Sequence, residues 1–187
     1  MARKKKSLTE AVSAEIQSNF NLDAFKEKKG LKQNIKFKDQ EWIPLSQAFQ
    51  DVTSIPGIPM GHIVLLRGHS DTGKTTAMIE AAVSAQKRKI LPVFIITEMK
   101  WNWEHATQMG MDVKEVKDPE TGEVQNYEGN FIYVDRESIN SIEDVASFIL
   151  DLIDEQKKGN LPYDLLFLWD SIGSVPCEMS LKSNKNN

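Results

Sequence analysis

Residues 68–75 carry the clearest chemical signature in this sequence. They read Gly-His-Ser-Asp-Thr-Gly-Lys-Thr, a complete match to the phosphate-loop pattern GxxxxGK[ST]. The glycines let the backbone wrap a phosphate, Lys74 supplies positive charge at the β- and γ-phosphates, and the Thr75 hydroxyl can ligate Mg²⁺. We therefore expect a bound nucleotide to contact Gly68, His69, Ser70, Asp71, Thr72, Gly73, Lys74, Thr75 and Thr76.

Two carboxylates follow apolar segments and could complete such a site. Asp170 ends the apolar run Leu165–Trp169, the Walker B pattern, and from a strand end it can reach Mg²⁺ beside Thr75 through water. Glu98 follows Val93–Thr97, which places it at the carboxyl edge of the predicted sheet, where open α/β sheets bind ligands. There it could accept a hydrogen bond from the attacking water, although a solvated loop acid remains the alternative.

Alternating strands and helices must position these groups. Short apolar runs predict strands at residues 63–67, 92–97, 131–134 and 165–169, and helical patterns cover residues 74–86 and 102–110 and a segment that begins at Ser141. The polar stretch 117–129 predicts an exposed turn or hairpin. Four strands separated by helices indicate a parallel sheet covered on both faces, the α/β fold class.

The first 43 residues differ in character from the rest. Residues 7–10 have the spacing of a capping box, and the apolar positions between Leu8 and Ile16 share one helical face. Residues 21–40 are weakly patterned and predict a linker. We therefore expect an N-terminal helix and linker at residues 1–43 and a separate α/β domain at residues 44–187.

Composition sets limits on the function. The single Cys177 excludes an intramolecular disulfide, and no run approaches the roughly 20 apolar residues of a membrane helix. The basic amino terminus lacks the apolar stretch of a secretory signal, so we expect a cytoplasmic location. Residues 61–187 carry 13 Lys and Arg against 20 Asp and Glu, a balance that argues against sequence-independent DNA binding as their main task.

Further segments make the sequence resemble a known family. Residues 59–64 read Pro-Met-Gly-His-Ile-Val before the phosphate loop, and Glu98 follows the next strand. Residues 109–112 read Met-Gly-Met-Asp, and residues 169–171 read Trp-Asp-Ser. This ordered set resembles the ATPase core of RecA-type recombinases, in their bacterial and phage branch.

The resemblance covers about residues 44–180, and it implies a partial RecA-like ATPase domain at residues 44–187 with an oligomerisation element in residues 1–43. It implies a RecA-like core with ATP and Mg²⁺ as ligands, Thr75 and Asp170 at the metal, and Glu98 and Lys74 as catalytic residues. It also implies homologous recombination and DNA repair in a bacterial or phage-infected cell, with self-association in a filament. Single-stranded DNA would be the partner, through segments that come later in the family's chains.

The sequence departs from the family in several places. His105 stands where the family often stacks an aromatic ring on adenine, and Trp101 or Trp103 could take that role or pack against the surface of the first domain or a neighbouring subunit. The polar stretch at residues 117–129 is longer than the corresponding turn in the family. In the family, the strand that follows Walker B carries a γ-phosphate sensor and lies between the phosphate-loop and Walker B strands. This sequence stops before such a strand, so we expect it to be the amino-terminal part of a longer recombinase or one piece of a split one.

Three roles remain open for the chain. The first is the ATPase part of a recombinase, with the helix at residues 8–16 packed on a neighbouring subunit or on its own domain. The second is the motor of a replicative helicase, because residues 96–99 (Ile-Thr-Glu-Met) resemble the acid-Met sequence of such motors. The third is a non-catalytic regulator that binds nucleotide and caps filaments of a full-length partner.

Overall fold

The chain divides into two compact units, residues 1–39 and residues 40–187. The computed structural model describes residues 21–30, 39–98 and 101–184. The helix expected at residues 8–16, with its capping box, lies outside the described residues. Among the helices that are described, none combines the length and the hydrophobicity needed to cross a bilayer.

The first unit contains the helix α2 (Leu22–Lys28) inside the segment 21–40 that the sequence predicted to be a linker, so that prediction is wrong for these seven residues. The side-chain oxygen of Asn21 accepts hydrogen bonds from the backbone N–H groups of Asp23 and Ala24. This N-cap satisfies two of the donors that a helix start leaves unpaired. Local capping therefore supports a helix whose apolar pattern is weak.

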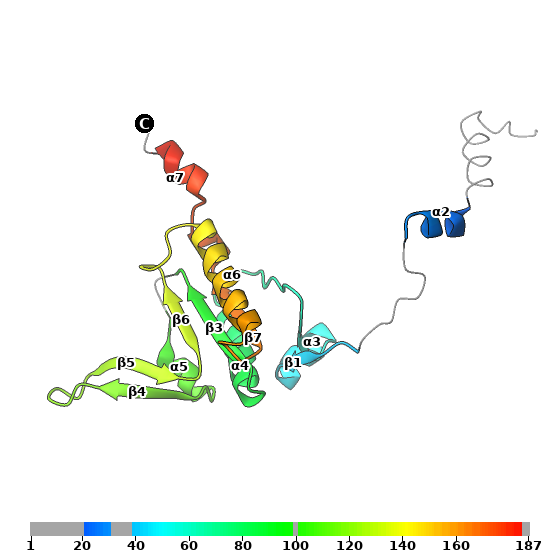
Figure 1. Cartoon of the computed structure of the whole chain (residues 1–187). Helices are drawn as coiled ribbons and strands as arrows, with labels where there is room; N and C mark the ends of the chain where they lie inside the picture. The colour runs from blue at the N-terminus through cyan, green and yellow to red at the C-terminus, as the bar shows by residue number, and fades with distance from the viewer. Residues whose placement is uncertain (1–20, 31–38, 99–100, 185–187) are drawn as a thin grey trace, which may run out of the picture. The chain divides into compact units, whose positions relative to one another are not determined.

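The second unit is built on a three-stranded parallel sheet (Figure 1). Its central strand β3 (Leu91–Ile96) pairs with β6 (Ile132–Asp135) on one side and with β7 (Leu165–Asp170) on the other. In the β3–β7 register, Ile96 lies opposite Asp170. Three of the four predicted strands are confirmed to within one residue at each end, and the α/β fold class is confirmed with them.

Two long helices cover opposite faces of the sheet (Figure 1). The helix α4 (Lys74–Lys87) packs in the cluster that contains Phe94, and α6 (Ile142–Lys158) packs in the cluster that contains Ile95. Adjacent residues of a strand point to opposite faces, so β3 is buried from both sides. Double burial explains why its sequence is apolar without alternation.

The strand expected at residues 63–67 is wrong. Residues 63–69 have no regular secondary structure, and the side chains of Ile63 and Leu65 are 101% and 72% exposed. A strand is held by the hydrogen bonds of a neighbouring ladder. Within the described residues the sheet ends at β7 on this side, so the segment has no strand to pair with.

Smaller elements complete the unit. The strands β1 (Trp42–Pro44) and β2 (Gly57–Pro59) form an antiparallel pair joined through α3 (Gln47–Thr53). A Cβ atom at Gly57 would meet the Ile43 carbonyl, so the close approach of these two strands requires glycine. After β7 the chain forms a short 3-10 turn, η1 (Ile172–Ser174), and the helix α7 (Glu178–Asn184).

Between β3 and β6 the chain forms α5 (Trp103–Gln108) and then a hairpin. The hairpin strands are β4 (Val113–Lys117) and β5 (Val124–Gly129), and together they project from the sheet in Figure 1. The predictions of a helix at residues 102–110 and of a turn or hairpin at residues 117–129 are confirmed, although the first strand begins four residues earlier.

Candidate nucleotide-binding site

The phosphate loop, residues 68–75, is a tight turn held by its own side chains. Gly73 has a φ of 85°, in the left-handed region that favours glycine. A Cβ atom on Gly68 would lie 2.7 Å from the Thr72 Oγ1 atom, which itself donates to the His69 carbonyl at 2.8 Å. The two glycines of the motif therefore serve different needs: Gly73 allows the backbone angle, and Gly68 allows the close approach.

The loop leads directly into α4, and no side chain caps the start of this helix. The first backbone N–H groups of a helix have no partner inside the helix. At the start of α4 these donors belong to Lys74 and Thr75, the last two motif residues, and to Thr76. Such donors, together with the helix dipole, suit an anion such as phosphate.

The Lys74 side chain folds back over the loop. Its Nζ atom donates to the carbonyl oxygens of Gly68 at 3.0 Å and His69 at 2.6 Å. The ammonium is thus held within the loop by acceptors that a phosphate oxygen could replace. This position fits the predicted role of Lys74 as the positive charge beside the nucleotide phosphates.

Thr75 and Asp170 meet although 95 residues separate them in the sequence. The Thr75 Oγ1 atom donates to the Asp170 Oδ2 atom at 3.2 Å. A hydroxyl and a carboxylate are the hard oxygen donors that Mg²⁺ prefers alongside phosphate and water. Among the described residues no three His, Cys, Asp or Glu side chains gather as a metal site. The role of Thr75 and Asp170 at Mg²⁺ stays a prediction.

Glu98 lies beside the same corner of the site. The backbone N–H groups of Thr97 and Glu98 both donate to the Asp170 carbonyl, at 2.8 and 3.2 Å. The Ser171 hydroxyl donates to the Glu98 Oε1 atom at 2.5 Å. The structure therefore places Glu98 next to Asp170 and Ser171, at the edge of the sheet where the sequence predicted it.

A polar network that sequence reasoning missed lies beneath these residues. The Thr97 side chain is buried, and its Oγ1 atom accepts a hydrogen bond from the Trp169 indole N–H at 3.1 Å. The hydroxyls of Thr97 and Ser174 lie 2.6 Å apart, and both approach the Ser171 carbonyl, at 2.9 and 2.7 Å. The available signal was the presence of a small hydroxyl residue directly after two of the strands, Thr97 after β3 and Ser171 after β7.

Comparison with known proteins agrees with this geometry. The family described as the RecA N-terminal domain matches residues 6–151. The chain belongs to the RecA family. It is 32% identical over 126 residues to Protein RecA of Aquifex aeolicus (strain VF5), an alignment that covers 66% of this chain and 35% of that protein.

Other RecA relatives match to a similar degree. Protein RecA of Kineococcus radiotolerans is 36% identical over 86 residues, covering 44% of this chain and 25% of that protein. Protein RecA of Thermotoga petrophila is 30% identical over 124 residues, covering 65% and 34%. The chain thus spans about a third or less of the length of the RecA proteins it matches.

Trp101, Trp103 and His105, the residues considered for stacking on adenine, differ in how they pack in this RecA-family core. Trp103 stacks on Tyr127 with ring centroids 4.9 Å apart and an interplanar angle of 20°, and Trp101 packs against Phe94 at 4.8 Å. Both indoles thus pack against the core cluster of the second unit, an arrangement that the sequence did not predict. His105 is half-buried on α5, and within the described residues it makes no hydrogen bond to the phosphate loop. Its adenine role stays a prediction.

Proposed function

We propose that this chain binds ATP with Mg²⁺ at the phosphate loop and hydrolyses it. The observation that carries the proposal is the contact between Thr75 and Asp170. It joins the hydroxyl of a complete phosphate-loop motif to the acid at the end of β7, and this pair of oxygen ligands is what a Mg-nucleotide requires.

Each residue then has a defined task. The N–H groups at the start of α4 and the Lys74 ammonium hold the phosphates, and Thr75 and Asp170 would hold the Mg²⁺ ion, which neutralises phosphate charge when bound. The Glu98 carboxylate accepts a proton from the attacking water. As the water oxygen bonds to the γ-phosphorus, the bond to the β–γ bridging oxygen breaks and its electron pair leaves with ADP.

At the level of the whole protein, we propose a DNA recombinase that acts in homologous recombination and DNA repair on single-stranded DNA. Membership of the RecA family supports this assignment, as does the order of its motifs along residues 59–171. Self-association in a filament in the cytoplasm of a bacterial or phage-infected cell belongs to the same proposal. The helicase motor is a less favoured alternative, because Asp170-Ser171 matches the recombinase pattern.

Titration with a fluorescent ATP analogue tests the binding step. We expect Lys74→Ala to weaken Mg-nucleotide binding about 10- to 100-fold, the effect of losing a charge-assisted hydrogen bond. Lys87→Ala is the matched control, since Lys87 is an exposed lysine at the other end of the same helix. Equal affinity of wild type and Lys74→Ala would overturn the proposed site.

A second titration, with and without Mg²⁺, tests the role of Asp170. We expect Mg²⁺ to strengthen nucleotide binding by the wild type and to have a smaller effect on Asp170→Asn, because the amide lacks the charge that attracts the cation. Phosphate release from bound ATP then tests turnover, and Glu98→Gln should abolish it while binding persists. Binding by the wild type without turnover would instead support the nucleotide-binding regulator.

A further inference from the structure

We propose that Ser171 is a positioning residue that holds the Glu98 carboxylate toward the attacking water. The inference rests on the proposed function of Glu98 in hydrolysis. It comes from the hydrogen bond that the Ser171 hydroxyl donates to the Glu98 Oε1 atom at 2.5 Å, between side chains 73 residues apart in the sequence.

The backbone of Ser171 is itself held in place by two neighbouring hydroxyl groups. Its carbonyl oxygen lies 2.9 Å from the Thr97 Oγ1 atom and 2.7 Å from the Ser174 Oγ atom. Thr97 is buried, and the Trp169 indole N–H holds its hydroxyl from the neighbouring strand. The hydroxyl of Ser171 therefore extends toward Glu98 from a backbone that the sheet edge anchors, as a positioning group requires.

Glu98 needs such a partner because its side chain is exposed. A glutamate in solvent samples many rotamers, and a fixed donor on one carboxylate oxygen reduces that freedom. The hydrogen bond uses Oε1 and leaves Oε2 without a hydrogen bond among the described residues. One oxygen is thus engaged in orientation, and the other remains able to accept a proton from water.

The register of the sheet makes this arrangement specific. Because Ile96 lies opposite Asp170, the residues that follow both strands leave the sheet side by side, and the Glu98 N–H reaches the Asp170 carbonyl. Ser171 therefore stands between the acid assigned to the metal and the acid assigned to the water. A hydroxyl here orients Glu98 without adding a charge that would compete for Mg²⁺.

The first arm of the test is independent of activity. Carboxylate ¹³C resonances of the chain labelled in glutamate would be recorded, and the Glu98 signal identified by its loss in Glu98→Gln. We expect this signal to move in Ser171→Ala and to return toward its wild-type position in Ser171→Thr, which keeps the hydroxyl. Ser138→Ala is the matched control, because it removes an exposed serine hydroxyl after the strand β6 that contacts Asp135 and neither Ser171 nor Glu98. A Glu98 signal unchanged in Ser171→Ala would overturn the inference.

The second arm measures ATP turnover with the same variants. We expect Ser171→Ala to lower kcat roughly tenfold with little change in KM, and Ser171→Thr to recover most of the loss. An unchanged or raised kcat in Ser171→Ala, with Glu98→Gln inactive, would overturn the positioning role alone. A wild-type chain that binds Mg-ATP without turnover would overturn the hydrolytic function and, with it, the role of Ser171.

Discussion

The two outer strands of the three-stranded sheet, β6 and β7, differ in what covers them. We call the β6 side the closed edge and the β7 side the open edge. Beyond β6, the aromatic rings of α5 and of the β4–β5 hairpin pack together around Phe94 and Trp103. Beyond β7, the segment that leads into the phosphate loop is irregular, and it exposes Ile63 and Leu65. Both edges contain a strand parallel to β3, so the difference lies in what covers them.

The contrast shows how distance along the chain affects packing. The closed edge is made almost entirely from residues 91–135, so its contacts close short loops at low entropic cost. The open edge needs residues 63–67 and 165–170, which are about a hundred positions apart. The proposed nucleotide site lies on this open side, as expected of binding regions that come from the less stable part of a fold.

The largest effect should come from the aromatic cluster on the β6 side of the sheet, which includes Phe94 of the central strand β3. Phe94 is completely buried, and its ring contacts the rings of Trp101, Trp103 and Phe131. Phe94→Ala removes these contacts and leaves a cavity, so we expect a loss of about 3–5 kcal/mol in the free energy of unfolding by urea denaturation. Leu65→Ala, on the open edge, should cost far less. Equal losses would erase the contrast between the edges.

A ring stack joins the hairpin to this aromatic cluster. Tyr127 lies 4.9 Å from Trp103, centroid to centroid, and Tyr127→Ala should cost about 1 kcal/mol because such pairs contribute 0.5–1.5 kcal/mol. Tyr127→Phe keeps the ring and should be close to neutral. A neutral Tyr127→Ala in the same denaturation experiment would show that the hairpin does not help to close the edge.

A smaller effect is expected on the open edge. Ile63→Thr should change the free energy of unfolding by no more than about 0.5 kcal/mol, because the side chain is already in solvent. Ile79→Thr on α4 is the matched control: Ile79 is buried, and we expect a loss of at least about 2 kcal/mol. If Ile63→Thr costs as much as Ile79→Thr, the segment at residues 63–67 is packed as a strand after all.

The same contrast explains what the sequence could predict. Most strands and helices between residues 74 and 170 follow from apolar periodicity and from the turn and capping residues at their ends, and the structure confirms them. The segment at residues 63–67 has equally good strand composition, but a strand also needs a neighbour, which local sequence does not reveal. The helix α2 was missed for the opposite reason, since capping by Asn21 rather than an apolar face supports it.

The proposed site likewise has parts that the sequence could predict and one part that it could not. The GxxxxGK[ST] motif predicts the phosphate loop, and the apolar runs that precede Glu98 and Asp170 predict the two acids, because each signal is local. The contact between Glu98 and Ser171 depends on the register that places Ile96 opposite Asp170, and register is a property of two distant strands. Sequence reasoning placed both acids at one edge of the sheet but could not name the hydroxyl between them.

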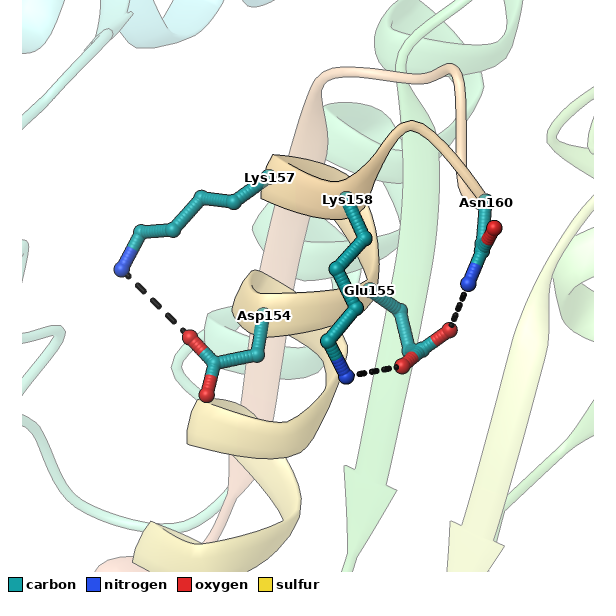
Figure 2. A network of polar contacts seen from close by, with 5 residues as sticks. All are labelled: Asp154, Glu155, Lys157, Lys158 and Asn160. Carbon is teal, nitrogen blue, oxygen red and sulfur yellow. Dashed lines mark hydrogen bonds and ion pairs between the residues drawn. The ribbon is translucent and has the colours of Figure 1, made fainter.

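The smallest effect should come from a charge network at the end of α6 (Figure 2). At the end of α6, the Lys158 Nζ atom lies 2.8 Å from the Glu155 Oε1 atom, and the Asn160 amide donates to Oε2 at 2.7 Å. Asp154 and Lys157 form a second pair at 3.5 Å. All four charged side chains are substantially exposed, so water and salt screen these pairs.

Lys158→Gln tests this network through pH and salt. The hydrogen bond from Lys158 lowers the pKa of Glu155 below its ordinary value of 4.5, and the same bond raises the pKa of Lys158 above its ordinary value of 10.5. The Glu155 contribution to stability is therefore present above pH 4.5 and is lost as the pH falls through the lowered pKa. The Lys158 contribution is present below pH 10.5 and is lost as the pH rises through the raised pKa.

We therefore expect Lys158→Gln to lower the thermal midpoint slightly, between these two pH values and at low ionic strength. The difference from wild type should vanish in about 1 M salt, where the screening length is about 3 Å. Thermal melts across pH and salt provide the measurement, with amide exchange of β3 as the readout for the sheet. A salt-independent loss approaching that of Phe94→Ala would mean that α6 depends on surface charge as much as the closed edge depends on its aromatic rings.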